Sequence, residues 1–323
     1  MMLSRLLAKR ALELTQMLHI IYRSHGGDNT KNRPDYYSKL LALTSFIRCA
    51  QRLSIGAADI FLNDGPITQD RLRIMEKWGE VVARSNLGAR GSMQTALKIP
   101  ALRAWRDDHL VWFSEDDYLY LPRALNGLIT ATKAFPDASY FALYAMFGSR
   151  MPNGDPSTDR IPRQCSESEI TIVHGRPWRR TVSTTSTFGS RVKPLIEDRL
   201  TMQVAIRSGG AWDHTTCLMY QGLTPYPMSS LLNSLLDPAA KKHWLHRTGI
   251  FGARIGLNLY QAVRSRKQSS RRTLVAPDPA LITHLETKYL ALGTDWRSFA
   301  RSTQQWINSG YCETQQDFLH SAI

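Results

Sequence analysis

The sequence predicts an α/β protein with a mostly parallel central sheet and helices on both faces. Strand and helix patterns alternate in units of roughly 30 residues through the first half of the chain, as in strand–helix–strand units. The run Leu110-Val111-Trp112-Phe113 is continuously apolar, which is typical of a strand covered on both sides. Polar clusters follow the strands, so functional side chains are expected at the carboxyl edge of the sheet.

The first two units are defined by apolar runs that stop at turn residues. A strand at 18–22 ends in the polar loop 23–33, and a helix is expected to start at Asn32-Arg33-Pro34-Asp35. A second strand at 58–62 stops at Asn63-Asp64-Gly65-Pro66, which is a strong turn signal. A helix at about 68–77 completes this unit.

The following units complete the expected sheet. We expect a strand at 79–83, a helix from about Gly91 to Trp105 and the strand at 110–113. The segment 149–169 is rich in Pro, Gly, Asp and Ser and is interpreted as a long loop. A strand at 170–173 and a helix from about Pro194 to Arg207 come next. We expect a catalytic domain at 1–237 and a basic, helical C-terminal appendage at 238–323.

Charge and cysteine content narrow the class of protein. The net charge of +14 over 323 residues implies an anionic partner, which can be a nucleic acid, an acidic membrane surface or a phosphorylated substrate. The four cysteines form no CxxC pair, which excludes the common zinc-finger spacings and favours a reducing compartment. No apolar run approaches the roughly 20 residues that span a bilayer. A cytoplasmic protein, at most peripheral at the inner membrane face, is expected.

Three consecutive acids, Glu115-Asp116-Asp117, follow the apolar strand directly. Alternate side chains of an extended chain face the same way, so Glu115 and Asp117 should point to one side and Asp116 to the other. Carboxylates of this kind bind Mg²⁺ or Mn²⁺, which take their remaining ligands from substrate phosphates and water. A solvated acidic turn is the alternative, but the place at the carboxyl edge of the sheet favours a functional site.

The segment 112–120 resembles the "DXD" segment of bacterial glycosyltransferases with the GT-A fold, especially the family-2-like group with an EDDYLH-type sequence. The last position here is Tyr120 instead of histidine. The similarity extends to Asn86-Leu87-Gly88 and to the segment 178–188 followed by Ile196-Glu197-Asp198, and covers about residues 15–235.

This resemblance implies a GT-A-like, metal-dependent hexosyltransferase. Asp117 would bind the Mn²⁺ or Mg²⁺ that bridges the donor diphosphate, and Asp116 or Glu115 would contact the ribose or the sugar. Glu197-Asp198 would supply the general base of an inverting reaction, with Asp198 favoured. Acids that complement a helix dipole are the alternative for this pair. The donor would be a UDP-sugar and the acceptor a saccharide or a lipid-linked saccharide.

Other candidates stand near the strand ends. Arg33 and Asp64 are expected to meet the nucleotide base and ribose, and Arg84 and Asn86 to face the nucleotide pocket; each can instead cap a turn or helix. The resemblance also suggests His214 as a metal ligand, although a histidine is more often a surface or packing residue.

Two amphipathic basic stretches, at 3–14 and 250–267, fit an anionic bilayer surface. An ordinary packed helix explains the first at least as well, whereas the second favours the membrane because basic residues continue to Arg272.

Two other functions remain open on the sequence. A nucleic-acid-binding protein would explain the charge, but no such motif is present and acids at the strand ends would repel phosphate, so we expect no nucleic acid as partner. A nucleotidyltransferase on a similar sheet would carry a Gly-rich loop with Lys or Arg after the first strand, and Arg23-Ser24-His25-Gly26-Gly27 comes near that pattern.

Overall fold

A computed structural model describes residues 17–27, 31–85, 87–145, 170–207, 211–229, 231–232 and 244–310, the last range without the side chains of 244–247. The expected loop at 149–169, the basic stretch at 3–14 and Asn86 lie outside these residues.

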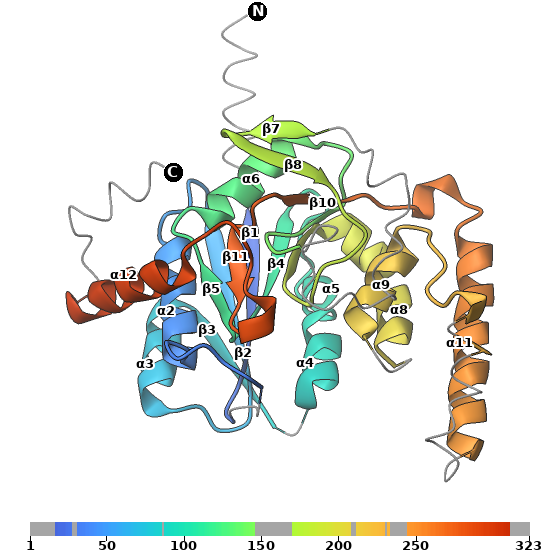
Figure 1. Cartoon of the computed structure of the whole chain (residues 1–323), viewed down its shortest axis with the longest axis horizontal. Coiled ribbons are helices and arrows are strands. Elements are labelled where there is room, and N and C mark those ends of the chain that lie inside the picture. The colour runs from blue at the N-terminus through green and yellow to red at the C-terminus, as the bar shows by residue number, and fades with distance from the viewer. Residues whose placement is uncertain are drawn as a thin grey trace, which may run out of the picture.

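Within these ranges, nine strands form one central sheet (Figure 1). They are β1 (Leu18–His25), β2 (Ala57–Asp64), β3 (Glu80–Arg84), β4 (Leu110–Glu115), β6 (Tyr140–Phe141), β7 (Thr171–Val173), β8 (Arg176–Arg180), β9 (Phe188–Arg191) and β10 (Leu274–Pro277). The strand order is β3-β2-β1-β4-β9-β6-β10-β8-β7, and β9 and β8 run against the others. The expected mostly parallel sheet is therefore confirmed.

The helices divide between the two faces of this sheet. The described α-helices are α2 (Lys39–Ala50), α3 (Gln69–Trp78), α4 (Gly88–Ala96), α5 (Ile99–Leu102), α6 (Ala124–Ala134), α8 (Val192–Arg207), α9 (Trp212–Tyr220), α11 (Trp244–Arg264) and α12 (Trp296–Asn308). One hydrophobic cluster joins the strands to α2, α3, α6 and α12, and a second joins them to α4, α8 and α9.

Successive side chains of the apolar strands alternate between the two hydrophobic clusters. Ile20 and Tyr22 of β1 belong to the first cluster and Ile21 between them to the second. In β4, Trp112 faces the first cluster while Val111 and Phe113 face the second. Because successive side chains of a strand point to opposite faces, a strand covered on both sides must be apolar throughout.

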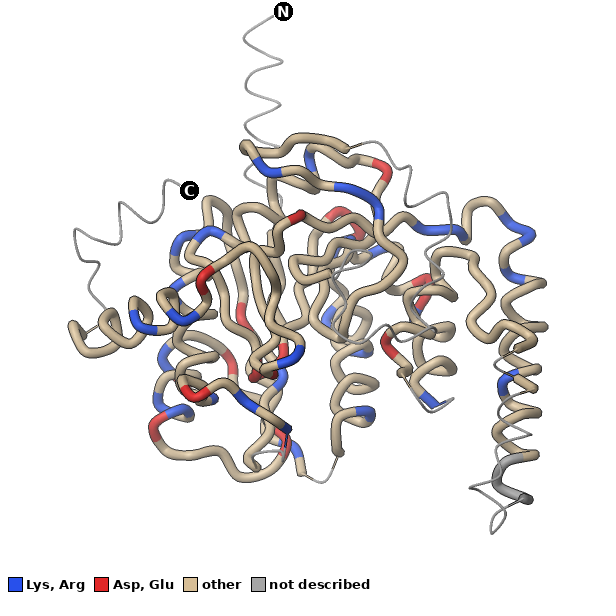
Figure 2. The backbone as a smooth tube through the Cα atoms, in the orientation of Figure 1, with Lys and Arg blue, Asp and Glu red and all other residues tan. Residues whose placement is uncertain are grey.

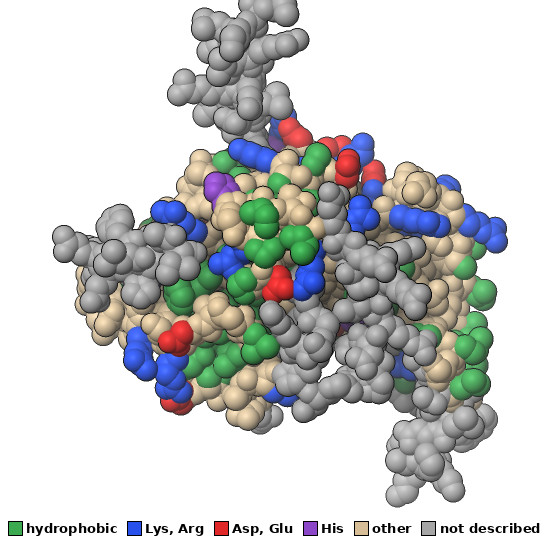
Figure 3. Space-filling model, turned by 45° about the horizontal axis from the view of Figure 1, so that its top comes forward, with side chains coloured by type: hydrophobic (Ala, Val, Ile, Leu, Met, Phe, Trp, Pro, Cys, Tyr) green, Lys and Arg blue, Asp and Glu red, His purple; other side chains and the backbone are tan. Residues whose placement is uncertain are grey.

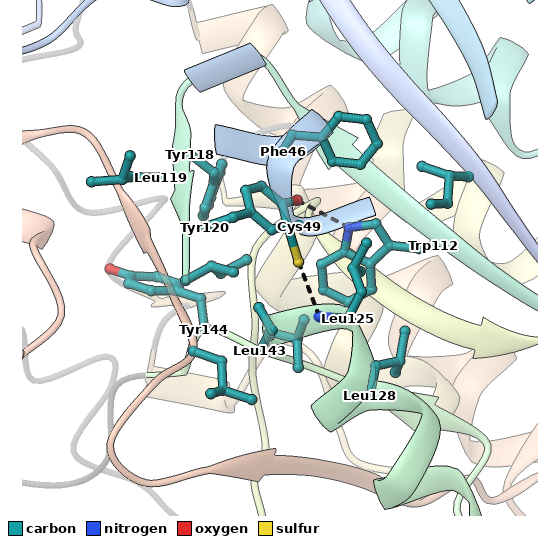
Figure 4. Close-up of a cluster of buried hydrophobic side chains, with 14 of the residues drawn as sticks. Phe46, Cys49, Trp112, Tyr118, Leu119, Tyr120, Leu125, Leu128, Leu143 and Tyr144 are labelled. Atoms are coloured by element: carbon teal, nitrogen blue, oxygen red, sulfur yellow. Dashed lines mark hydrogen bonds between the residues drawn. The ribbon is translucent and has the colours of Figure 1, made fainter. Parts of the chain in front are cut away.

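A rigid core supports the turn that carries the three acids. The turn joins β4 to β5 (Tyr118–Tyr120). The hydroxyl of Tyr120 accepts from Nε1 of Trp112 (3.0 Å), and the backbone N–H of Leu125 donates to Sγ of Cys49 (Figure 4). The same hydroxyl lies 2.7 Å from Oγ of Ser114. Burial raises the pKa of the Tyr120 phenol, which keeps it neutral. The tyrosine at the last position of the motif thus has a packing role.

The chain beyond residue 238 takes part in the sheet. β10 lies between β6 and β8, and β11 (Ile282–His284) pairs with β5 in a separate two-stranded sheet. α12 packs on α2 through the first cluster, whereas α11 stands at the side of the molecule (Figure 1). The region after the boundary expected at 238 therefore contributes a strand to the central sheet.

Two helices differ from their expected bounds. α2 begins at Lys39 and not at Asn32, because Ser38 accepts a hydrogen bond from the backbone N–H of Leu41 and caps the helix. The helix expected from Gly91 to Trp105 is two helices, α4 and the short α5, which has Pro100 in its first turn.

Among the described residues, no helix combines the length and the apolar character that crossing a bilayer would need.

Candidate active site

The carboxyl ends of β1, β2, β3 and β4 bring the expected polar residues to one edge. In the sheet register, Arg23 lies beside Glu115 on one side, and His25 lies beside Asp64 on the other. On the next strand, β3, Arg84 lies beside Asp64 of β2. Figure 2 shows acidic and basic positions gathered at this edge of the sheet.

Glu115, at the end of β4, pairs with a buried arginine. Nη2 of Arg23 lies 3.3 Å from Oε1 of Glu115, and Nε of Arg23 donates to Oγ of Ser92 on α4. Burial raises the pKa of Glu115, opposed by Arg23 and reinforced by the neighbouring charge of Asp117. The pair therefore links the turn formed by Glu115, Asp116 and Asp117, called the acid turn below, to α4.

Asp116 binds a different set of groups. Its Oδ2 accepts from Oγ of Ser24 (3.1 Å) and from the backbone N–H of His25 (2.8 Å). The same oxygen lies 3.0 Å from Nζ of Lys39 and 3.7 Å from Nη1 of Arg71, and both cationic side chains are nearly buried. One carboxylate thus faces two cations, which leaves a local surplus of positive charge.

Asp117 lies in the turn between β4 and β5 and has partners different from those of Asp116. Its Oδ2 lies 3.0 Å from Nε2 of His284 and 3.1 Å from Nη2 of Arg33. Burial opposes ionisation of Asp117, but the hydrogen bond from His284 and the charge of Arg33 hold its pKa well below the usual range. The backbone N–H of Leu285 donates to the carbonyl of Asp117, which fixes β11 against the turn.

His284 is the residue that the sequence analysis missed. It ends β11, where the register pairs it with Tyr118, the residue after Asp117. The other ring nitrogen, Nδ1, lies 3.8 Å from Oε2 of Glu286, which in turn pairs with Lys31 at 3.2 Å. In the sequence around His284 the only hint of a site is a short apolar run that ends in this histidine. The residue is identified only by the pairing of β11 with the distant strand β5.

The Asp117–His284 pair has the chemistry of a metal site. A carboxylate oxygen and an imidazole nitrogen are ordinary ligands of Mn²⁺, and they lie side by side here. Within the described part of the chain, no three His, Cys, Asp or Glu side chains are arranged to hold an ion. A cation at this pair would therefore need further ligands from water and substrate phosphates, which Mg²⁺ and Mn²⁺ commonly use.

Asp64 and Arg84 have local partners. Asp64 is buried, and its two carboxylate oxygens accept the backbone N–H groups of Leu87 (3.0 Å) and Gly88 (2.7 Å) at the start of α4. Arg84 is exposed and donates to the carbonyl of Ala83. Asp64 thus caps a helix, the alternative that the sequence left open.

Glu197 and Asp198 lie on α8 with basic partners of their own. Asp198 is 1% exposed, and its carboxylate lies 2.5 Å from Nη2 of Arg264 and 3.0 Å from Nε of Arg272. Oδ2 also accepts from the hydroxyl of Tyr140 at 2.8 Å. Glu197 pairs with Arg272 at 2.6 Å. Both oxygens of Asp198 are therefore occupied, whereas a general base needs one that can reach the acceptor.

His214, the second expected metal ligand, has a hydroxyl partner. It belongs to α9, and its Nδ1 lies 2.8 Å from Oγ of Ser183. The histidine that hydrogen-bonds to Asp117 is His284.

A cleft adjoins the acid turn on the α8–α9 side. The cleft is small and partly open to solvent, and its lining includes Ser186, Phe188, Met202, Trp212, Asp213 and Tyr220. Ser186 of this lining also interacts with the carboxylate of Glu115 and opposes the rise in its pKa. Oδ1 of Asp213 accepts the backbone N–H of His214 (2.9 Å), and burial raises the pKa of this carboxyl. A carboxyl group with a raised pKa in a cleft is a candidate catalytic group.

Comparisons with known proteins return structural likenesses alone. No protein-family model and no curated protein matches the sequence. Among solved structures, CMP:2-keto-3-deoxy-manno-octonic acid synthetase complexed with CTP is similar at 12% identity and a TM-score of 0.38, over 58% of this chain and 78% of that one. S. aureus TarS in complex with UDP is similar at 14% identity and a TM-score of 0.36, over 64% and 54% of the two chains.

A third structure is the Mycobacterium tuberculosis glucosyl-3-phosphoglycerate synthase with Mn²⁺, UDP-glucose and phosphoglyceric acid. It is similar at 10% identity and a TM-score of 0.37, over 57% of this chain. The chain spans 59% of the length of that enzyme. TM-scores this low identify no family, so the function must be argued from the site itself.

Proposed function

We propose that the chain is a metal-dependent, GT-A-like glycosyltransferase that takes its sugar from a nucleoside diphosphate donor. The observation that carries the proposal is the Asp117–His284 pair, 3.0 Å apart at the carboxyl edge of a mostly parallel sheet. Ligands bind at this edge in open α/β sheets. A UDP-sugar is the proposed donor, and a saccharide or a lipid-linked saccharide the proposed acceptor.

The donor diphosphate would meet two kinds of positive charge. Asp117 and His284 would hold Mn²⁺ or Mg²⁺, which when bound neutralises charge on the leaving diphosphate. Lys39 and Arg71 would attract the same phosphates, because the single carboxylate of Asp116 balances only one of the two cations. Asp116 would therefore orient the phosphate-binding cations, and Glu115 would contact the sugar or ribose.

Asp213 is the proposed general base. It lines the same cleft as Ser186, which interacts with Glu115, and burial raises the pKa of its carboxyl. The acceptor oxygen would attack the anomeric carbon and lose its proton to Asp213, while the bond from that carbon to the diphosphate breaks. Direct displacement of this kind inverts the anomeric configuration. Asp198 would instead hold α8, α11 and the start of β10 together through Arg264 and Arg272.

The proposal is tested with the purified protein and a panel of nucleoside diphosphate sugars. We expect release of nucleoside diphosphate, by hydrolysis or transfer, that requires Mn²⁺ or Mg²⁺ and stops on chelation. The Asp117→Asn variant should lose it, while Arg84→Ala, at an exposed position of the same edge, should keep it. Full activity of Asp117→Asn, or turnover without a divalent cation, would contradict the metal-dependent mechanism.

A nucleotidyltransferase is the second candidate, favoured by the contacts of Lys39. Its Nζ donates to the carbonyls of His25 (2.7 Å) and Gly27 (2.6 Å), so a cation holds the glycine-containing loop after β1. Loops of this kind cradle nucleotide phosphates. Release of pyrophosphate from CTP or UTP in the presence of a sugar phosphate, with no activity on nucleoside diphosphate sugars, would support this candidate over the first.

A further inference from the structure

We propose that the outward face of α11 binds an anionic membrane surface. This inference is independent of the proposed reaction, because it rests on the side of the molecule that α11 forms (Figure 1). It concerns the part of the helix whose side chains are described, together with the turn that follows at Arg266 and Lys267.

The face in question is apolar, exposed and continuous. Leu259 and Val263 are each 64% exposed, and Tyr260 is 38% exposed. Gly249, Gly252 and Gly256 precede them at helical spacing, and a Cβ at any of these glycines would meet no atom within 4 Å. Positions spaced three and four residues apart form one stripe of a helix, so these residues share one surface. Figure 3 shows hydrophobic side chains along this edge of the molecule.

The opposite face of the same helix is satisfied by the protein. Leu257 is buried and belongs to a small core with Ala205, Met219 and Leu231. Asn258 exchanges hydrogen bonds with the backbone of Tyr226, and Arg264 reaches Asp198. One side of the helix thus packs against the protein, and the apolar side chains on its other side remain exposed in the folded chain.

The charge of the region selects an anionic partner. From Lys241 to Pro277 the chain contains nine Lys and Arg residues and no Asp or Glu; Arg264 and Arg272 are paired with Asp198, while Arg266 and Lys267 are exposed. Arg266 and Lys267 directly follow α11 in a hydrogen-bonded turn and are exposed, so cations follow the C-terminal end of the apolar face. A second copy of the chain would bring equal positive charges against each other, which disfavours self-association through this face.

An apolar stripe that ends in cations matches the surface of a bilayer with anionic lipids. Leu, Tyr and Val side chains enter the headgroup–acyl boundary, while Arg and Lys meet the phosphates. Nucleic acid would use the cations but not the exposed leucine and valine. The combination of the two features therefore assigns the face to a membrane.

Vesicle flotation with the full chain tests the inference without any measurement of activity. Vesicles of phosphatidylcholine alone are compared with vesicles that also contain phosphatidylglycerol. We expect binding to the second kind, weakened by salt. The pairs Leu259→Asp/Val263→Asp and Arg266→Glu/Lys267→Glu should each reduce the partition coefficient roughly tenfold or more. Leu102→Asp is the matched control, because Leu102 is 78% exposed on α5.

Each other outcome counts against the inference. Absence of binding to anionic vesicles overturns it, and so does binding that both pairs of substitutions leave unchanged, since other basic surface would then be responsible. A dimer in light scattering that Leu259→Asp/Val263→Asp dissociates would assign the face to a second copy instead. If the apolar pair lowers the melting temperature, the Arg266→Glu/Lys267→Glu pair decides, because those exposed side chains support no core.

Discussion

Nε2 of His284 lies 3.0 Å from Oδ2 of Asp117, although 167 positions of sequence separate the two residues. The pairing of β11 with β5 explains the contact, because it sets His284 beside Tyr118, the residue that follows Asp117. The segment that contains His284 thus lies beside the acid turn, although it follows the residues that line the cleft in the sequence. The proposed metal site depends on this return.

Replacing His284 with alanine should weaken metal binding. Asp117 would keep Arg33 as its partner but lose the neighbouring nitrogen ligand. We expect the affinity for Mn²⁺ in the presence of UDP, measured by calorimetry, to fall by at least about tenfold. His109→Ala is the matched control, since His109 precedes β4 at the end opposite to Glu115 and its ring bonds to that of His19. Equal effects of the two substitutions would remove His284 from the metal site.

The Asp213→Asn substitution should separate chemistry from binding. The side chain lines the cleft, and an amide of the same size cannot accept the acceptor's proton. We expect kcat to fall by about 100-fold or more while the affinity for the donor with Mn²⁺ stays the same. Steady-state kinetics together with calorimetry measure both. An Asp213→Asn enzyme with normal kcat would place the base elsewhere.

Asp198→Asn should act mainly on stability. The substitution leaves the cations of Arg264 and Arg272 beside a neutral amide at a site that is 1% exposed. Breaking a buried ion pair by removing one partner costs about 3–5 kcal/mol of unfolding free energy. Urea unfolding measures this loss. Glu197→Gln, at a side chain that is 47% exposed, should cost less than about 1 kcal/mol. Loss of turnover in Asp198→Asn without loss of stability would restore the catalytic interpretation.

The central strands could be predicted because their signal is local. Leu110 to Phe113 are apolar at every position, and that pattern alone requires cover on both faces. The acids of the turn were found for the same reason, since they follow the strand directly. The start of α2 was missed because Pro34 favoured a helix start in the sequence, whereas the hydroxyl of Ser38 caps the helix.

The partners of these acids could not be predicted from local sequence. Arg264 and Arg272 reach Asp198 from 66 and 74 positions away, and nothing around Glu197-Asp198 distinguishes a paired buried acid from a free base. His284 likewise stands in a segment whose strand is three residues long. Contacts of this kind depend on how distant strands and helices pack, so they require the folded structure.

The buried carboxyl of Asp59 should make the stability of the folded protein depend on pH. It lies on β2 opposite Ile20, and within the described residues its Oδ1 has no hydrogen-bond partner. Burial raises the pKa of this carboxyl from 3.8 to about 7. The folded state therefore favours the protonated form more than the unfolded state does. The stability that this preference supplies is fully present below pH 3.8 and is lost as the pH rises through about 7.

The Asp59→Asn substitution should remove this dependence. Asparagine stays neutral, so the variant should be more stable than the parent above pH 7 by up to about 4 kcal/mol and nearly equal to it at pH 4. Urea unfolding at pH 4.5, 6 and 8.5 measures the difference. Asp107→Asn, at an exposed position, should show no such trend. If the gain from Asp59→Asn did not grow with pH, the Asp59 carboxylate would have to be ionised and solvated in the folded protein.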